Sequence, residues 1–170
     1  MDACNEALRL DSYSTHAYST KGSVLVSLGR YREALVACDQ ALRLDPNNSQ
    51  AHGVAGGALV CLERHQEAVR AIERDLQLDP SSADSYFNRG QVLLKFRRFQ
   101  EAVTAYDQAL RLDPDFFLAY ICRGAAYLGL GFPNAALSSV EEGLRRDPSS
   151  PQAPLAYEAR AEILRNLGYR

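Results

Sequence analysis

The chain has little of what builds metal, redox or disulfide sites. It contains three histidines and four cysteines in 170 residues. The cysteines are far apart, form no Cys-x-x-Cys pair and have no histidine at ligand spacing; they are Cys4, Cys38, Cys61 and Cys122. This distribution predicts reduced thiols in a cytoplasmic protein and argues against a disulfide framework or a zinc site. We therefore expect no metal and no cofactor.

Long apolar runs and an excess of either charge are also missing. The most apolar stretch, from Phe116 to Phe132, contains Arg123 and is too short to span a membrane. The N-terminal residues lack the apolar core of a secretory signal. Lys and Arg number 19 against 21 Asp and Glu, a formal charge of -2, so no basic field would attract a phosphate backbone. We expect neither a membrane protein nor a nucleic-acid-binding protein.

Catalytic motifs are absent as well. The sequence has no GxSxG, GxxxxGK[ST] or HExxH, which excludes the usual nucleophile elbow, phosphate loop and zinc-protease helix. The three histidines, His16, His52 and His65, are too far apart to form a helical ligand pair. Adjacent carboxylates such as Glu141 and Glu142 are typical of exposed helix faces. We therefore predict that the chain is not an enzyme and has no catalytic residues.

What the sequence does contain is an internal repeat with a period of about 34 residues. Four residue types keep this step through four units. The prolines are Pro46, Pro80, Pro114 and Pro148, each preceded by Asp, and the leucines are Leu42, Leu76, Leu110 and Leu144. The glycines are Gly22, Gly56, Gly90 and Gly124, and the alanines are Ala34, Ala68, Ala102 and Ala136. Four types in one register are not expected by chance.

Each repeated residue type has a physical reason for its position. Proline lacks an amide hydrogen and clashes with the preceding turn, so Asp-Pro ends the second helix of a unit. The glycines and alanines let neighbouring backbones approach, although each helical glycine costs up to about 1 kcal/mol. Only two of the turns inside a unit have a glycine, Gly29 and Gly131. The residues expected to cap the following helices are Ser49, Ser82, Asp115 and Ser150.

The combined pattern resembles the tetratricopeptide repeat (TPR) over nearly the whole chain. An aromatic residue stands four positions before three of the glycines, at Tyr18, Tyr86 and Tyr120, and another follows two of the turns, at Tyr31 and Phe99. The departures are His52 and His65 for aromatics, Asp75 and Gly143 for a packing alanine, and Pro133 after the last turn. The resemblance implies an all-α fold, a right-handed α-solenoid of antiparallel helix pairs forming a TPR superhelix.

The register predicts four full units, at 15–48, 49–82, 83–116 and 117–150, with an incomplete unit on each side. Residues 1–14 match only a second helix, and residues 151–170 contain the first helix of a further repeat or a capping helix. Because solenoid units bury their apolar faces against neighbours, this pattern predicts a segment of a larger protein. Self-association through the two incomplete ends would be a heterologous contact.

The resemblance also implies that the first helices line a concave groove that holds a protein or peptide. The groove residues expected in the third and fourth units are Phe87, Asn88, Gln91, Leu94, Lys95, Leu118, Ile121, Cys122, Ala125 and Leu128. Relatives that clamp acidic chaperone tails use several Lys, Arg and Asn side chains, whereas here only Asn88 and Lys95 resemble such donors. We expect an apolar peptide or amphipathic helix instead.

Two alternatives stay open at this point. The apolar groove residues could pack against the helix expected at 154–168 or against a second copy of the chain. The array could also be the substrate-recruiting or regulatory arm of an enzyme whose catalytic domain lies outside these residues, an interpretation that rests on analogy with other TPR-bearing proteins. The favoured hypothesis is a protein–protein interaction scaffold.

Overall fold

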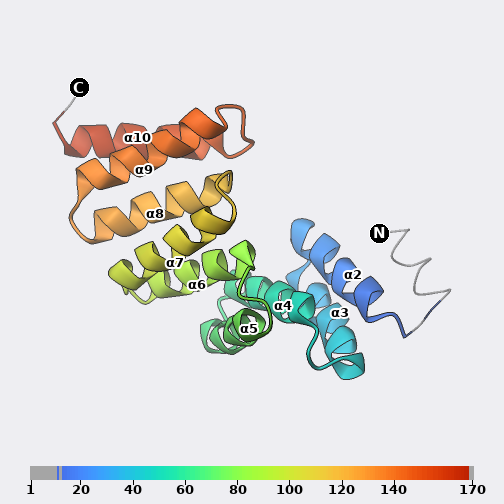
Figure 1. Cartoon of the computed structure of the whole chain (residues 1–170). Helices are drawn as coiled ribbons and strands as arrows, with labels where there is room; N and C mark the ends of the chain where they lie inside the picture. Colours follow the sequence, from blue (N-terminus) through green and yellow to red (C-terminus); the bar gives the residue numbers. More distant parts are fainter. Residues whose placement is uncertain (1–10, 12, 169–170) are drawn as a thin grey trace. The chain divides into compact units, whose positions relative to one another are not determined.

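Nine α-helices make up the regular structure of the residues that the computed structural model describes, which are residue 11 and residues 13–168. Figure 1 labels them α2 to α10 in chain order. The helices of the first half are α2 (Thr15–Ser27), α3 (Tyr31–Leu44), α4 (Ser49–Cys61) and α5 (His65–Leu78). Those that follow are α6 (Ala83–Lys95), α7 (Phe99–Leu112), α8 (Phe117–Gly129), α9 (Pro133–Arg146) and α10 (Ala153–Asn166). The predicted partial helix of residues 1–14, with Cys4, lies almost wholly outside the described residues.

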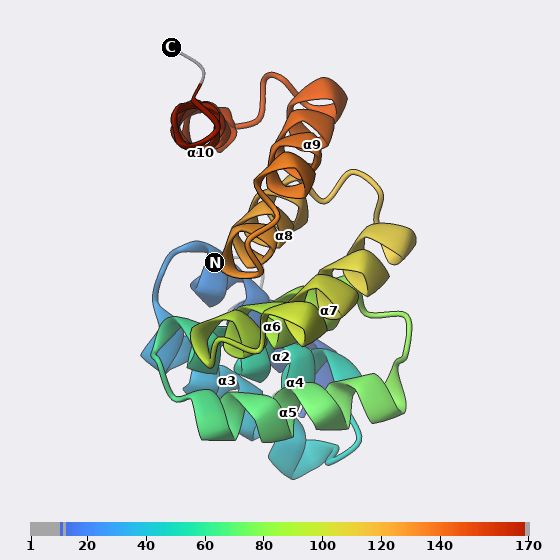
Figure 2. The same ribbon diagram turned by 90° about the vertical axis from the view of Figure 1, so that its left-hand side faces the viewer.

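The helices form two compact units, Met1–Asn88 and Arg89–Arg170, with the boundary inside α6. In the first unit α2 packs against α3 and α4 packs against both α3 and α5. In the second unit α8 packs against α7 and α9, and α9 also packs against α10. Figures 1 and 2 show α8 and α9 side by side as a helix pair. The second helices α3 and α9 therefore contact the first helix of their own repeat and that of the next.

Small residues at the repeated positions make this close packing possible. The alanines of the repeat, Ala34, Ala68, Ala102 and Ala136, are fully buried. Larger apolar side chains fill the space around them, as in the cluster of the second unit that includes Phe117, Val140, Leu144 and Ile163. Apolar burial of this kind supplies most of the stability of short helices, which are marginal on their own.

The aspartate of each Asp-Pro pair has a role that the sequence analysis did not assign. The Asp45 carboxylate accepts the backbone N–H of Asn47 at 3.0 Å, and the same Asx turn recurs at Asp79, Asp113 and Asp147. These bonds fix the turn between one repeat and the next. Hydrogen bonds from the side chain and backbone of Ser81 also lower the pKa of Asp79.

Only one of the four predicted helix caps is correct. The Oγ of Ser82 accepts a backbone N–H of the first turn of α6, from Ser85 at 3.3 Å. The residues found at the N-cap positions of α4, α8 and α10 are Asn48, Phe116 and Gln152. The caps of α4, α6 and α8 all lie two residues after the proline, so Ser49 is one residue too late and Asp115 one residue too early. Ser150 is wrong because α10 begins later, at Ala153, with Gln152 at its N-cap.

The turn inside each repeat uses the left-handed backbone conformation whether or not glycine is present. Gly29 and Gly131 have φ values of 71° and 78°, and Glu63 and Arg97 hold the same repeat position with φ of 58°. A side chain in this region clashes with the following carbonyl, which costs about 1 kcal/mol or more. The two turns without glycine are therefore under backbone strain.

We expect Glu63→Gly and Arg97→Gly each to raise the free energy of unfolding by about 0.5–1 kcal/mol, because glycine removes the clash. The gain is limited because glycine also increases the conformational entropy of the unfolded chain. Urea unfolding followed by circular dichroism measures the change. Gln66→Gly, in the helical part of α5, is the matched control and should lower stability by about 1 kcal/mol. A loss of stability in both turn variants would contradict the prediction.

Candidate peptide-binding site

The groove residues expected from the sequence differ widely in exposure. Lys95, Ala125 and Leu128 are exposed, the last with 37% of its surface accessible. Phe87 is 8% exposed and so belongs to the core. The half-buried members are Asn88, Gln91, Leu94, Leu118, Ile121 and Cys122. Phe87 and Asn88 lie in the first unit and the other eight residues lie in the second.

Within the second unit, the accessible members of this set come from α6 and α8 and occupy equivalent repeat positions. Leu94 and Leu128 are one repeat apart, as are Gln91 and Ala125. At the first of these positions both helices have a leucine. At the second position α6 has the amide side chain of Gln91, whereas α8 has the small apolar residue Ala125. These four residues provide apolar contact area and one hydrogen-bonding side chain, Gln91, to which the exposed Lys95 of α6 adds a second.

Two members of the set on α8 are committed to packing inside the second unit. Ile121 packs against the apolar cluster that contains Phe117, Val140 and Ile163, which joins residues of α8, α9 and α10. The Cys122 thiol interacts with Tyr106, and burial raises its pKa to about 11. A protonated thiol in such surroundings is inert.

The side chain of Asn88 lies against α4 in the first unit. A Cβ built on Gly57 of α4 would lie 3.1 Å from the Nδ2 atom of Asn88. The amide therefore rests directly over the backbone of α4, and the glycine leaves space for it. Asn88 is one of the predicted groove residues, and its place over Gly57 shows where its side chain lies.

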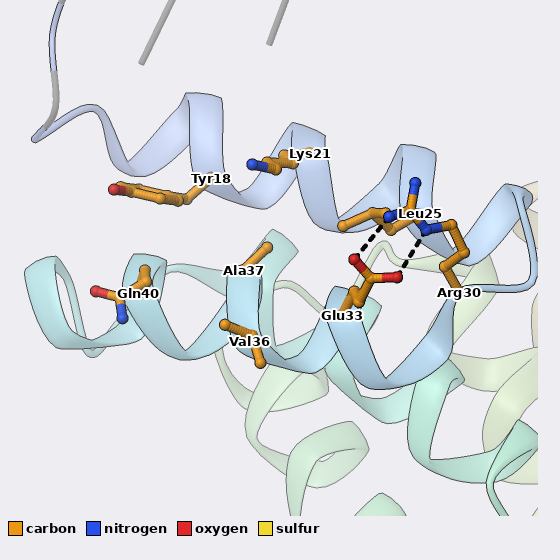
Figure 3. Close-up of a pocket in the computed structure, with 8 residues that line it drawn as sticks. All are labelled: Tyr18, Lys21, Leu25, Arg30, Glu33, Val36, Ala37 and Gln40. Carbon is orange, nitrogen blue, oxygen red and sulfur yellow. Dashed lines mark hydrogen bonds and ion pairs between the residues drawn. The ribbon is translucent and has the colours of Figure 1, made fainter. Parts of the chain in front are cut away.

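A cleft that the sequence analysis did not identify lies between α2 and α3 (Figure 3). Its volume is about 540 Å³. The lining residues are Tyr18, Lys21, Leu25, Arg30, Glu33, Val36, Ala37 and Gln40. The guanidinium of Arg30 donates two hydrogen bonds of 2.7 Å to the Glu33 carboxylate, which lowers the pKa of Glu33. Arg64–Glu67 and Arg98–Glu101 repeat this pair, so it is a feature of the repeat and not of a special site.

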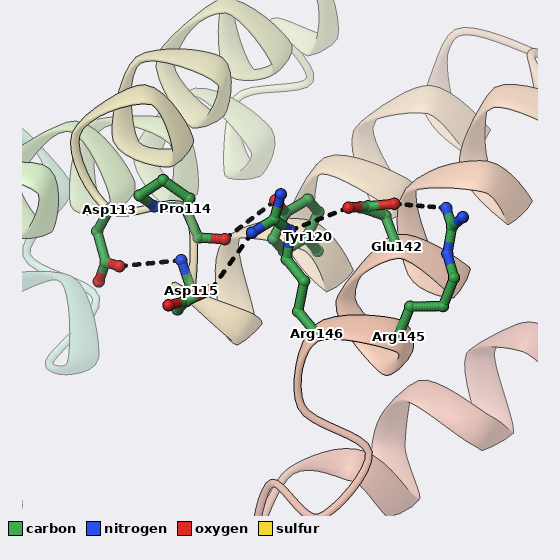
Figure 4. Close-up of polar contacts among 7 residues, drawn as sticks. All are labelled: Asp113, Pro114, Asp115, Tyr120, Glu142, Arg145 and Arg146. Carbon is green, nitrogen blue, oxygen red and sulfur yellow. Dashed lines mark hydrogen bonds and ion pairs between the residues drawn. The ribbon is translucent and has the colours of Figure 1, made fainter.

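A polar cluster fixes the start of α8 to the end of α9 (Figure 4). The Tyr120 hydroxyl donates to the carbonyl of Pro114 at 3.1 Å. Arg146 pairs with Glu142 at 2.9 Å and with Asp115 at 3.3 Å, and its guanidinium lies 5.7 Å from the centre of the Tyr120 ring. These polar groups are paired with one another inside the second unit, which is typical of a structural network and not of a reaction centre.

The described part of the chain contains no group of three or more His, Cys, Asp or Glu side chains arranged to hold a metal ion. Among its helices, none combines the length and the apolar character needed to cross a bilayer.

Comparison with known proteins identifies the repeat. Residues 98–131 match the family described as TPR repeat, and residues 16–48 match the family described as tetratricopeptide repeat. No curated protein matches the sequence. Three solved structures illustrate the likeness of fold. YrrB, a TPR protein with an unusual peptide-binding site, is 23% identical, with 99% of this chain and 85% of YrrB covered and a TM-score of 0.71.

The other two structures give similar values. TTC0263, a thermophilic TPR protein of Thermus thermophilus, is 20% identical over 95% of this chain and 87% of its own, with a TM-score of 0.79. The Cut9–Hcn1 hetero-tetramer of the APC/C has a chain that is 19% identical. Its match covers 96% of this chain but 32% of that chain, with a TM-score of 0.86.

Residues 16–48 and 98–131 are therefore tetratricopeptide repeats, and the predicted fold class, an all-α solenoid of helix pairs, is confirmed. Tetratricopeptide repeats are scaffolds for protein–protein interaction and are generally non-catalytic. This class of function follows from the repeat itself, whereas the ligand depends on the side chains that vary between repeats.

Proposed function

We propose that the chain is an interaction scaffold that binds an apolar peptide or an amphipathic helix through the first helices of its third and fourth repeats. The observation that carries the proposal is the composition of α8. Its groove positions hold Leu118, Ile121, Cys122, Ala125 and Leu128, none of them charged, and Ile121 and Cys122 support this surface from inside the second unit. Ala125 and Leu128 are exposed. A surface of this kind gains most by removing apolar area of a ligand from water.

The charged and amide groups of the same set suit the edges of such a ligand. Lys95 is exposed on α6, and Gln91 lies half-buried one turn earlier. A carboxylate that loses its water shell needs several charge-assisted donors at once. Lys95 and Gln91 can form hydrogen bonds with polar groups at the ends of a bound peptide. Two donors are too few to replace the water around a buried terminal carboxylate. We therefore propose that apolar side chains of the ligand, and not its terminus, determine binding.

A library of random peptides displayed on phage tests this proposal. Selected peptides should carry apolar residues at helical spacing, i, i+3 or i+4 and i+7, with no requirement for a free C-terminus. Their affinity for the variant Ala125→Glu/Leu128→Glu should fall at least about tenfold, or about 1.4 kcal/mol. Fluorescence anisotropy with labelled peptides measures the loss, and circular dichroism checks that the variant is folded.

Leu112→Glu is the matched control, because Leu112 is also an exposed leucine, 42% accessible, but ends the second helix α7. It should leave affinity unchanged. The proposal fails if the selected peptides share only a terminal carboxylate, or if the α8 variant and the control bind them equally well.

A further inference from the structure

Three side chains at one edge of the second unit differ from their counterparts in the other repeats. Lys95 and Arg97 stand at positions that hold no cation elsewhere; the counterparts are Ser27, Cys61 and Gly129 for the first and Gly29, Glu63 and Gly131 for the second. Phe132 stands where the other repeats have Arg30, Arg64 and Arg98. All three side chains are exposed. Since the ligand depends on the side chains that vary between repeats, these three are candidates for recognition.

The two turns that carry these residues lie at the same edge of the second unit. Figure 1 shows the connection from α6 to α7 and the connection from α8 to α9 at the left of the view. The Phe99 ring joins them, since a Cβ built on Gly129 would lie 2.5 Å from it. The Arg97 guanidinium lies over the same ring, 5.7 Å from its centre. Arg97 is therefore held where the two turns meet, beside the end of α8.

Two phenylalanine rings are exposed at this edge. Phe96 and Phe132 have 54% and 56% of their surface accessible, whereas the other phenylalanines of the chain are buried or half-buried. In the other three repeats the counterpart of Phe132 is an arginine that pairs with a glutamate three residues later. In the fourth repeat Ala135 replaces that glutamate, so an exposed ring takes the place of the ion pair. Together with Leu128, the two rings extend the apolar surface of the proposed groove to the ends of α6 and α8.

The charge of this edge is positive although the chain as a whole has a formal charge of -2. Its cations are Lys95, Arg97 and Arg98, and its one carboxylate, Glu101, pairs with Arg98 at 2.6 Å. Residues 128–135 add no charged side chain. The edge thus combines exposed aromatic rings with a surplus of positive charge, and α10 already packs on α9, so its exposure does not depend on a further repeat.

Charge complementarity favours a partner segment with carboxylates next to its apolar side chains. An anionic membrane is a poorer fit, because two surplus charges contribute only about 2 kcal/mol and the net charge of the chain opposes the approach. A second copy of the chain is also a poorer fit. Its exposed Leu44 and Leu112 each precede an aspartate, but the carboxylates of Asp45 and Asp113 already accept backbone hydrogen bonds.

We infer that this edge, formed by Lys95, Phe96, Arg97 and Phe132 and called the basic edge below, binds side-chain carboxylates of the segment that the groove holds. The inference rests on the proposed function for the position of that segment, and it adds acidic side chains to the segment's definition. Arg97 has a left-handed backbone, with φ of 58°, where glycine would be less strained. Strain of this kind is typical of functional positions. A carboxylate at an exposed edge keeps part of its water shell, so a few cations suffice to bind it.

Peptide selection on the full chain, scored by charge, tests the inference. Peptides from a random phage library should carry more Asp and Glu than Lys and Arg within about four residues of their apolar side chains. Their affinity, measured by fluorescence anisotropy, should fall at least about threefold between about 50 mM and about 500 mM NaCl, because salt screens exposed charges. Arg97→Glu should weaken the same peptides about tenfold and abolish this salt dependence.

Arg97→Gly separates binding from stability. This variant is expected to be more stable than the natural protein, yet it should bind the acidic peptides about three- to fivefold more weakly. Peptides with Asn and Gln in place of Asp and Glu should lose the same affinity for the natural protein and should not distinguish it from Arg97→Gly. Arg111→Glu is the matched control, because Arg111 is an exposed arginine in the last turn of α7, away from the basic edge. It should leave affinity unchanged.

The outcomes separate this inference from the proposed function. Selected peptides that depend on Ala125 and Leu128 but show no acidic excess, and bind Arg97→Gly normally, would overturn the inference and leave the proposed function intact. Acidic peptides that depend on Arg97 but not on Ala125 and Leu128 would support the basic edge and contradict the groove. Arg97-dependent binding to phosphatidylserine vesicles, or Arg97-dependent self-association in light scattering, would assign the edge to a membrane or to a second copy and would overturn the inference.

Discussion

Replacing Ser49 and Ser85 together by alanine should lower the free energy of unfolding by about 3 kcal/mol. Asp75 of α5 is 2% exposed and stands where other repeats have a packing alanine or glycine. Its two carboxyl oxygens accept hydrogen bonds from the hydroxyls of Ser49 and Ser85. A buried carboxyl group that loses both donors has no water to replace them, and this penalty far exceeds the value of an ordinary exposed hydrogen bond.

Urea unfolding of the double variant measures the loss, and a third substitution tests its cause. Asp75→Ala in the same background removes the unsatisfied group and restores the residue found in two other repeats, Ala41 and Ala109. The triple variant should return to within about 1 kcal/mol of the natural protein. If it stays as unstable as the double variant, the hydroxyls act through packing and not through Asp75.

A matched control is available on α2. The hydroxyls of Ser23 and Ser27 donate to backbone carbonyls one turn earlier, at 3.2 Å each, and no buried charge depends on them. Ser23→Ala/Ser27→Ala removes the same number of hydroxyls and should change stability by no more than about 0.5 kcal/mol.

The helix pairs could be predicted from the sequence because they depend on local rules. Asp-Pro ends a helix wherever it occurs, and glycine or alanine once per repeat allows close packing whatever surrounds it. The turn at Glu63 could not be assigned in the same way, since its left-handed backbone is imposed by the helices on either side and its residue type argues against it. The partners of Asp75 likewise come from α4 and α6, on either side of its own helix.

The candidate site was harder to predict, because exposure depends on how far a side chain reaches and on what neighbouring helices leave open. Phe87 and Ile121 occupy the repeat position held by Ser19 and Gly53 in the first two repeats. At this position the structure buries Phe87 and packs Ile121 against the core cluster. Leu128, two turns further along α8, is exposed. The repeat register gives the direction of a side chain but not its final contacts.

Gly90→Ala should be one of the most damaging single-methyl changes in the second unit. A Cβ on Gly90 would lie 2.5–2.8 Å from three carbons of the Tyr106 ring, and that ring is fully buried. Alanine improves helix propensity by up to about 1 kcal/mol. The added methyl group would overpack against this buried ring, and this penalty outweighs the gain in helix propensity. We therefore expect the free energy of unfolding to fall by about 2–3 kcal/mol. Gly22→Ala, where the neighbour is a cysteine sulfur at 3.0 Å, should lose less than about 1 kcal/mol.

A double-mutant cycle with Tyr106→Val separates this clash from any other effect of the methyl group. Tyr106→Val alone leaves a cavity and should cost about 3 kcal/mol. In the double variant the added methyl enters that cavity, so the two losses should fall short of additivity by at least about 1.5 kcal/mol. Additive losses would show that Gly90 is required for its backbone and not for the space above it.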